Sequence, residues 1–210
     1  MKEKKKELLI KFNKDNIIRA ARELFSEHGI ERTTMDEIAR RADYSKSTIY
    51  VYFKSKEEIY DHILYENMCY LKKIIEESIS ESKGFESNFY AICSSLVKFQ
   101  SQYPLYFESL TGKIEVSDEA MKKIPILKDI FITGDEINKI IINVLHKGIE
   151  ENKVQHDIEL IPTVFTLWAS ICGIIFMSYE KEEYIVNLMK KSRKEFLDYS
   201  FRMLYKSIIK

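Results

Sequence analysis

The residues most suited to chemistry lie in one short polar segment, SKSTIYVYF, residues 45–53. Small hydroxyls and a lysine at the start of a helix can reach base edges and phosphates, and the free helix amides also favour phosphate. Tyrosines add flat rings with donor hydroxyls that suit a sugar–phosphate wall. The segment therefore predicts a helix that enters the major groove of DNA. Its candidate contact residues are Lys46, Ser47, Thr48, Tyr50 and Tyr52.

Two helices must position this segment. The first is expected over residues 13–28, where apolar side chains recur at helical spacing and Gly29 supplies a C-terminal stop. The second is expected from about residue 34 to 42, with Thr33 as its N-cap and Asp36 three residues later as a weak capping box. A helix this short must be held by packing, because it is marginal alone.

A tight turn and a third helix complete the pattern. Asp43 and Tyr44 are expected to form the turn, and the Ser45 hydroxyl to cap the third helix. Ile49 and Phe53, four residues apart, are expected to point into the core. The alternative is a solvated, tyrosine-bearing turn of an all-helical protein. Two capped helices joined by a turn favour a helix-turn-helix over that alternative.

At these residues the sequence resembles the TetR family of transcriptional regulators. The resemblance covers about the first sixty residues and is one of architecture over the rest. One departure is Val51, where many relatives carry a second aromatic residue. The matching positions are Phe25, Gly29, Thr33, Thr34, Met35, Ile38, Ala39, the run from Tyr44 to Tyr50, Tyr52, Phe53 and the run from Lys54 to Glu58.

The resemblance implies an all-α homodimer that binds a double-stranded DNA operator. An N-terminal three-helix helix-turn-helix domain, residues 1–57, would precede a helical ligand-binding and dimerisation domain, residues 58–210. It implies that Thr34 contacts phosphate at the start of the second helix and that Lys56 holds a phosphate from the start of the fourth. It also implies a small-molecule effector.

Composition agrees with an all-α protein. The 210 residues include only six Gly and three Pro, and no alternating strand pattern stands out. The formal net charge is zero, which argues against a general nucleic-acid coat, so any basic footprint is expected to be local. No apolar run is expected to reach the ~20 residues of a membrane span, so no membrane partner is predicted. The basic N-terminus is either a frayed, solvated end or an arm that adds phosphate contacts.

No catalytic constellation is recognisable, so an enzyme and a cofactor are not expected. Cys69, Cys93 and Cys172 are widely separated and form no Cys-x-x-Cys pair, which favours buried thiols in a reducing cytoplasm. The four histidines show no metal-ligand spacing, so no metal site is predicted.

Two features of the remaining chain bear on its function. Residues 162–179 and 184–208 are expected to be long helices that, in the family, pair with their mates in a four-helix bundle. The first is apolar nearly all round, as a helix buried on every face would be, although a core helix of a monomer would look the same. The candidate interface residues are Trp168, Ile171, Ile175, Phe196 and Tyr199.

Aromatic residues crowd the middle of the chain and could line a pocket for a hydrophobic or aromatic ligand. Ordinary core packing is the alternative for each of them. The candidate lining residues are Phe99, Tyr103, Phe107, Phe131, Phe165 and Trp168.

The sequence thus predicts a ligand-responsive repressor released from a palindromic operator. Two alternatives are a ligand-independent architectural DNA-binding protein of the same fold, and a helical enzyme or carrier with a vestigial N-terminal domain. The operator sequence, the regulated genes, the ligand, and the choice between repression and activation are not encoded in any recognisable pattern.

Overall fold

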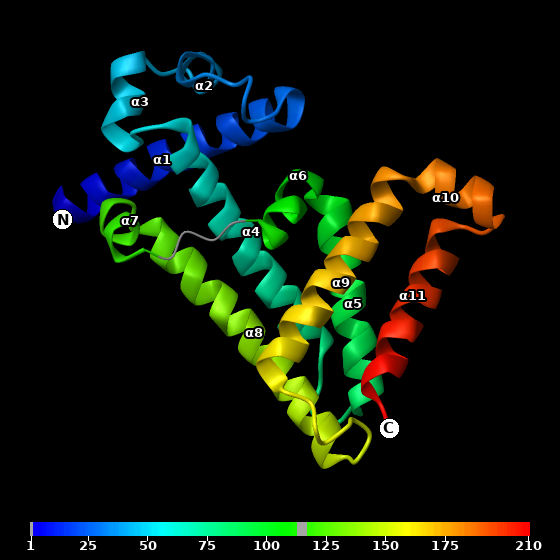
Figure 1. The fold of residues 1–210 in the computed structure, drawn as a ribbon. Coiled ribbons are helices and arrows are strands. Elements are labelled where there is room, and N and C mark those ends of the chain that lie inside the picture. Colours follow the sequence, from blue (N-terminus) through cyan, green and yellow to red (C-terminus); the bar gives the residue numbers. More distant parts are fainter. Residues whose placement is uncertain (1, 113–116) are drawn as a thin grey trace. The chain divides into compact units, whose positions relative to one another are not determined.

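The computed structural model describes residues 2–112 and 117–210, apart from the side chains of Lys2 and Asp118. These residues form α-helices, one 3-10 helix and no named strand, which confirms the predicted all-α class (Figure 1). The elements are α1 (Lys2–His28), α2 (Met35–Arg41), α3 (Lys46–Tyr52), α4 (Lys56–Ser78), α5 (Phe85–Gln102), α6 (Pro104–Phe107), η1 (Glu108–Thr111), α7 (Asp118–Lys123), α8 (Ile126–Glu150), α9 (Leu160–Glu180), α10 (Glu182–Met189) and α11 (Arg193–Ile208).

The chain divides into two compact units. The first contains Met1–Glu66 and Glu115–Ile130, and the second contains Asn67–Ile114 and Phe131–Lys210. The sequence resemblance implies a domain boundary after residue 57. The division in the structure differs from it, because the first turns of α4 belong to the first unit. Ile59 and Ile63 of α4 are fully buried there.

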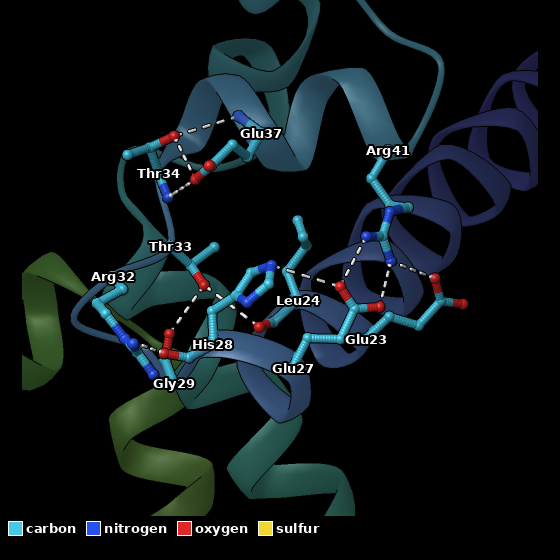
Figure 2. Close-up of polar contacts among 10 residues, drawn as sticks. All are labelled: Glu23, Leu24, Glu27, His28, Gly29, Arg32, Thr33, Thr34, Glu37 and Arg41. Atoms are coloured by element: carbon cyan, nitrogen blue, oxygen red, sulfur yellow. Dashed lines mark hydrogen bonds and ion pairs between the residues drawn. The ribbon is translucent and has the colours of Figure 1, made fainter.

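In the first unit, α2 is fastened to α1 by polar contacts (Figure 2). Arg41 reaches both carboxylate oxygens of Glu27, each at 2.8 Å, and lies 3.2 Å from Glu23. The Arg41 guanidinium holds the pKa of the Glu27 carboxyl below its ordinary value, since it donates hydrogen bonds to the ionised form. Exposed pairs of this kind add orientation more than stability.

The N-cap of α2 is one residue later than predicted. Thr34 forms the capping box with Glu37, rather than Thr33 with Asp36. Thr33 is buried, and its hydroxyl donates to the Gly29 carbonyl at 2.8 Å, so it closes the turn after α1 instead (Figure 2). The predicted stop at Gly29 is confirmed by its positive φ of 78°.

The predicted start and core face of α3 are confirmed. The Ser45 hydroxyl accepts from the Thr48 amide at 3.1 Å, and the turn before it has Asp43 in the left-handed region at φ 59°. Ile49 and Phe53 are 0% and 1% exposed, so this face of the helix is locked into the core.

The second unit is built around an apolar core shared by α4, α5, α8, α9 and α11. The break at residues 82–84 and Pro104 together predict a helix over about residues 85–102, which agrees with the bounds of α5. Pro125, predicted to mark either a kink or a helix start, directly precedes the start of α8. The predicted helix over residues 184–208 is wrong as a single element. Lys190 adopts a left-handed conformation at φ 55°, and Ser192 caps α11 with Glu195 in a capping box, so the chain breaks into α10 and α11.

We expected no apolar run of membrane-spanning length, but one helix meets the length and composition of such a span. Helix α9 has 21 residues, and an 18-residue window within it has a mean hydropathy of 2.0, enough to pass this test of length and composition. Core helices of globular proteins pass it as well, and Ile171, Cys172 and Ile175 bury one side of α9 in its own unit.

Two glycines of α8 give a stability prediction. A Cβ on Gly148 would lie 2.5 Å from Val154 and 2.7 Å from the Phe85 ring, whereas a Cβ on Gly134 would make an ordinary 3.5 Å contact with Met68. Gly148→Ala should therefore lower the free energy of unfolding by about 1–3 kcal/mol through overpacking. Gly134→Ala, the matched control, should raise it by up to about 1 kcal/mol through helix propensity. Urea unfolding followed by circular dichroism measures both, and a stabilised Gly148→Ala protein would contradict the close packing.

Candidate nucleic-acid interface

The first turn of α3 presents a connected set of hydroxyls. The Ser45 hydroxyl lies 2.8 Å from that of Ser47 and 2.7 Å from that of Thr48. Ser47 is exposed and Thr48 half-buried, as a surface that reads another molecule requires. These contacts orient small donors and acceptors at a helix start, where base edges are read in helix-turn-helix proteins.

Lys46 supplies the positive charge of this surface. Its ammonium forms an ion pair with the Asp36 carboxylate of α2 at 2.9 Å, and both side chains are exposed. The Asp36 carboxylate raises the pKa of Lys46 by accepting its hydrogen bond. Because the pair is solvated, it is weak, and a phosphate can replace the carboxylate at little cost.

Thr34, predicted to contact phosphate, is exposed but engaged within the chain. Its backbone amide and its hydroxyl each donate to the Glu37 carboxylate at 2.8 Å (Figure 2). These hydrogen bonds lower the pKa of the Glu37 carboxyl. A phosphate at this position must compete with an ionised side chain, so the Thr34 contact stays a prediction.

Lys56, also predicted to hold a phosphate, has a structural role that the sequence did not reveal. Its ammonium donates to the backbone carbonyls of Ile30 and Glu31 at 2.8 and 3.0 Å. It thereby fastens the loop between α1 and α2 to the start of α4. An ammonium has three protons, so one remains for a phosphate after these two bonds.

The two tyrosines differ in their surroundings. Tyr50 is 48% exposed, whereas Tyr52 is half-buried and accepts a hydrogen bond from the Asn13 amide at 2.7 Å. Asn13 lies 39 positions away on α1, so no local pattern indicated this contact. Val51, the departure from the family pattern, is 77% exposed.

The predicted ligand-lining residues do not form one cavity. Phe99 and Phe107 are buried in the core and Tyr103 is half-buried against Phe99, whereas Phe131 and Phe165 are 45% and 57% exposed. The last two predictions are therefore wrong, because both side chains face outward on α8 and α9. Trp168 does line a cavity, and its indole donates to the Leu110 carbonyl at 3.2 Å.

That cavity lies in the second unit and holds about 20 Å³, roughly the room for one water. It is wholly apolar and too small for a drug-sized ligand. The lining residues are Phe85, Phe89, Ile92, Leu96, Ile141, Val144, Leu145, Val164, Leu167, Trp168 and Ile171.

The predicted interface residues fall into two groups. Ile171 and Ile175 are 4% and 0% exposed and belong to the core of their own unit, so their assignment to a subunit interface is wrong. Trp168 and Phe196 are half-buried, and Tyr199 is 54% exposed. The sequence correctly predicted a long apolar helix at α9. Because that helix is apolar nearly all round, the sequence could not indicate which side faces the core.

No cluster of three or more His, Cys, Asp or Glu side chains suited to a metal ion occurs in the described part of the chain. Burial raises the pKa of the Cys93 and Cys172 thiols to about 12. Both are therefore inert at neutral pH.

Comparison with known proteins gives one family match and two curated relatives. Residues 17–63 match the profile described as bacterial regulatory proteins, tetR family. An uncharacterised HTH-type transcriptional regulator of Bacillus subtilis strain 168, YhgD, is 29% identical over 51% of this chain and 56% of its own length. The negative regulator of the icaADBC biofilm operon in Staphylococcus aureus, IcaR, is 42% identical over 30% of this chain and 33% of its own length.

Solved structures agree on the fold across nearly the whole chain. The fatty acid degradation regulator FadR of Bacillus halodurans superposes with a TM-score of 0.68 at 16% identity, covering 92% of this chain and 94% of that one. The FadR of Bacillus subtilis, crystallised with stearoyl-CoA, superposes with a TM-score of 0.67 at 19% identity, covering 92% and 98%.

Together, the fold and the exposed third helix define a helix-turn-helix domain of the class found in bacterial transcriptional regulators. Residues 17–63 carry the N-terminal domain of the TetR family. The chain spans only about half of the length of one of these curated relatives and a third of the other.

Behind α3, Asp61 and His62 of α4 occupy half-buried positions. The His62 ring contacts the edge of Phe53 at 5.3 Å, and burial and Lys14 lower the pKa of His62. Burial raises the pKa of Asp61 to about 6, and the neighbouring Glu58 and Glu57 add to the shift. An ionised Asp61 at neutral pH therefore costs stability.

Asp61→Asn should stabilise the protein at pH 7–8 by about 1 kcal/mol, a value discounted because solvent reaches this carboxyl. The folded state binds the Asp61 proton more tightly than the unfolded state, so the gain should shrink as the pH falls through 6 and vanish below about 4. Denaturant unfolding across this pH range measures the difference. Asp15→Asn, at an exposed site of α1, is the control, and an equal effect of both changes at pH 7 would contradict the account.

Proposed function

We propose that this protein binds a palindromic DNA operator as a homodimer and represses transcription. The observation that carries the proposal is the two-sided character of α3. One side is buried through Ile49, while the other exposes Lys46, Ser47 and Tyr50. The repressor assignment follows the naming of IcaR as a negative regulator.

Exposed apolar side chains on α9 and α11 support the homodimer. Phe165, Phe176 and Met177 of α9 are 57%, 42% and 50% exposed, and Met203 of α11 is 57% exposed. Several exposed large apolar side chains on these two helices are typical of a surface that another protein covers. Gly173 lies on the exposed side of α9 with open space around it, which allows a second helix to approach closely.

Two-fold symmetry gives this dimer a testable consequence for the operator. Each subunit would contribute one recognition helix to one half-site. The half-sites should then lie about 34–36 Å apart or a multiple of one DNA turn.

We further propose that a small apolar ligand releases the protein from its operator. The wholly apolar lining of the cavity beside Trp168 supports it, and the solved FadR of Bacillus subtilis holds stearoyl-CoA. The cavity must expand to admit such a molecule, and the ligand can shift the protein only by its differential affinity for the two conformations. The small volume favours the alternative, a DNA-binding protein of the same fold that needs no ligand.

Titration of the purified protein against its own upstream intergenic DNA and against a scrambled duplex tests the function. Binding that prefers the upstream duplex by at least about 1,000-fold at near-physiological salt is expected of a specific regulator. Equal binding to both duplexes that collapses with added salt would indicate phosphate contact alone and would contradict the proposal. A panel of long-chain apolar compounds added to the complex then separates the ligand-responsive form from the ligand-independent one.

Lys46→Ala should weaken operator binding because it removes one phosphate contact. The slope of log affinity against log salt should become shallower by about 1. Lys139→Ala is the matched control, since Lys139 is likewise exposed and paired with an aspartate, Asp135, at 2.7 Å, but lies on α8 in the second unit. Equal slopes for Lys46→Ala and the wild type would remove Lys46 from the interface.

Phe176→Glu should convert the dimer to a monomer, because a carboxylate would be buried without a partner in the apolar interface. Sedimentation equilibrium should then give about the chain mass of 24.9 kDa instead of twice that value. Leu8→Glu is the control, since Leu8 is 61% exposed on α1 in the first unit. A Phe176→Glu protein that stays dimeric at micromolar concentration would place the interface elsewhere.

A further inference from the structure

A chain of side-chain hydrogen bonds runs within the first unit from α1 to the end of α3. It joins Arg19, Asn16, Tyr44, Asn13 and Tyr52 in that order. We propose that this chain is a directional relay that prepares the Tyr52 hydroxyl to donate to a DNA phosphate, with Asn13 as the positioning residue. The inference rests on the proposed DNA-binding function and deepens it.

The direction is set at Arg19. Its guanidinium donates to the Asn16 side-chain oxygen at 3.0 Å. A guanidinium has no acceptor, so this bond forces the oxygen of the Asn16 amide toward Arg19 and its NH2 group toward Tyr44. The Asn16 NH2 group then donates to the Tyr44 hydroxyl oxygen at 3.4 Å.

The direction continues through Tyr44 and Asn13. Tyr44 donates its proton to the Asn13 side-chain oxygen at 2.7 Å, and the Asn13 NH2 group donates to the Tyr52 oxygen at 2.7 Å. With the Asn13 amide reversed, Tyr44 would receive two N–H donors and its own proton would lose this acceptor. An unmatched hydroxyl proton in a half-buried network costs free energy, so the observed orientation is favoured.

The relay ends at a hydroxyl that still has its proton to give. Within the described residues, Tyr52 makes this one side-chain hydrogen bond, and it does so as the acceptor. A donor polarised by successive hydrogen bonds is a better donor than an isolated phenol. Such a donor forms its strongest hydrogen bond with an anionic oxygen. Phosphate and sugar oxygens receive roughly half to two-thirds of all protein–DNA hydrogen bonds.

Lys14, beside Asn13 on α1, adds a positive charge to this part of the first unit, and its ammonium lies 5.4 Å from the centre of the Phe53 ring. The relay also immobilises a tyrosine that would otherwise have to be ordered on binding, which lowers the entropic cost of association.

The spacing of the relay residues on α1 explains how the sequence encodes it. Asn13, Asn16 and Arg19 are each three residues apart, so they lie on one side of the helix. Tyr44 in the turn before α3 and Tyr52 in its last turn complete the network.

A double-mutant cycle on operator affinity tests the relay. Tyr52→Phe removes only the hydroxyl and should weaken binding about tenfold, as the loss of one charge-assisted hydrogen bond predicts. Asn13→Ala should weaken binding by roughly 3- to 10-fold in the wild type and by less than about twofold in the Tyr52→Phe background. A purely structural role of Asn13 would weaken binding equally in both backgrounds.

Asn13→Asp keeps the shape of the side chain and serves if Asn13→Ala unfolds. A carboxylate can only accept, so it would take the Tyr52 proton away from the phosphate, and binding should fall at least about tenfold. This loss, too, should be smaller in the Tyr52→Phe background, where only the added charge acts. Thermal unfolding of each variant confirms that the domain remains folded.

The outcomes separate the relay from the function. Selective operator binding by the wild type, with an Asn13→Ala effect that is absent or unchanged in the Tyr52→Phe background, would overturn the relay and leave the regulator intact. Equal wild-type binding to operator and scrambled duplex would overturn the proposed function, and the DNA role of the relay with it.

Discussion

The burial of Ile49 and Phe53 is the constraint on which the recognition surface depends. Helix α3 has seven residues, and so short a helix is not stable by its own hydrogen bonds. Its conformation is imposed by packing against the core of the first unit, where Ile17, Ile59 and Ile63 are fully buried. Because one side is fixed in this way, the exposed hydroxyls, lysine and tyrosine of the other side have defined positions.

Polar contacts at the ends of the helices also help to orient α3 and its neighbours. Ser45 caps the helix, and Lys56 ties the loop after α1 to the start of α4 through two carbonyls. Each of these contacts adds only about 1 kcal/mol of stability by itself. Their effect is on orientation, which governs whether side chains meet phosphates and base edges without further ordering on binding.

The second unit uses a similar division in α9. Ile171 and Ile175 occupy the core, while Phe165 and Phe176 remain on the surface. Large apolar side chains left on the exposed side of a helix mark a surface that another chain can cover. The same helix that passes a compositional test for a membrane span therefore suits the proposed subunit interface.

Local patterns predicted the fold well and long-range contacts poorly. The Ser45 cap, the Gly29 stop and the bounds of α5 follow from neighbouring residues and agree with the structure. The break at Lys190 was missed because a left-handed lysine has no distinctive sequence signal.

For the site, the exposed candidates of α3 were identified from residue type and position. The role of Lys56 and the link from Asn13 to Tyr52 were missed, because their partners lie 26 and 39 positions away. Periodicity alone also cannot distinguish the inward side of α9 from the outward side, which misplaced Ile171 and Phe165.

Hydroxyl-radical footprinting of the protein with and without operator DNA tests the central claim most directly. Tyr50, 48% exposed on α3, should be protected from oxidation by the operator, whereas Tyr184, 65% exposed on α10, should be oxidised equally in both states. A scrambled duplex at the same concentration should leave Tyr50 unprotected at near-physiological salt. Operator binding that leaves Tyr50 as reactive as in the free protein would show that α3 is not the surface that reads DNA.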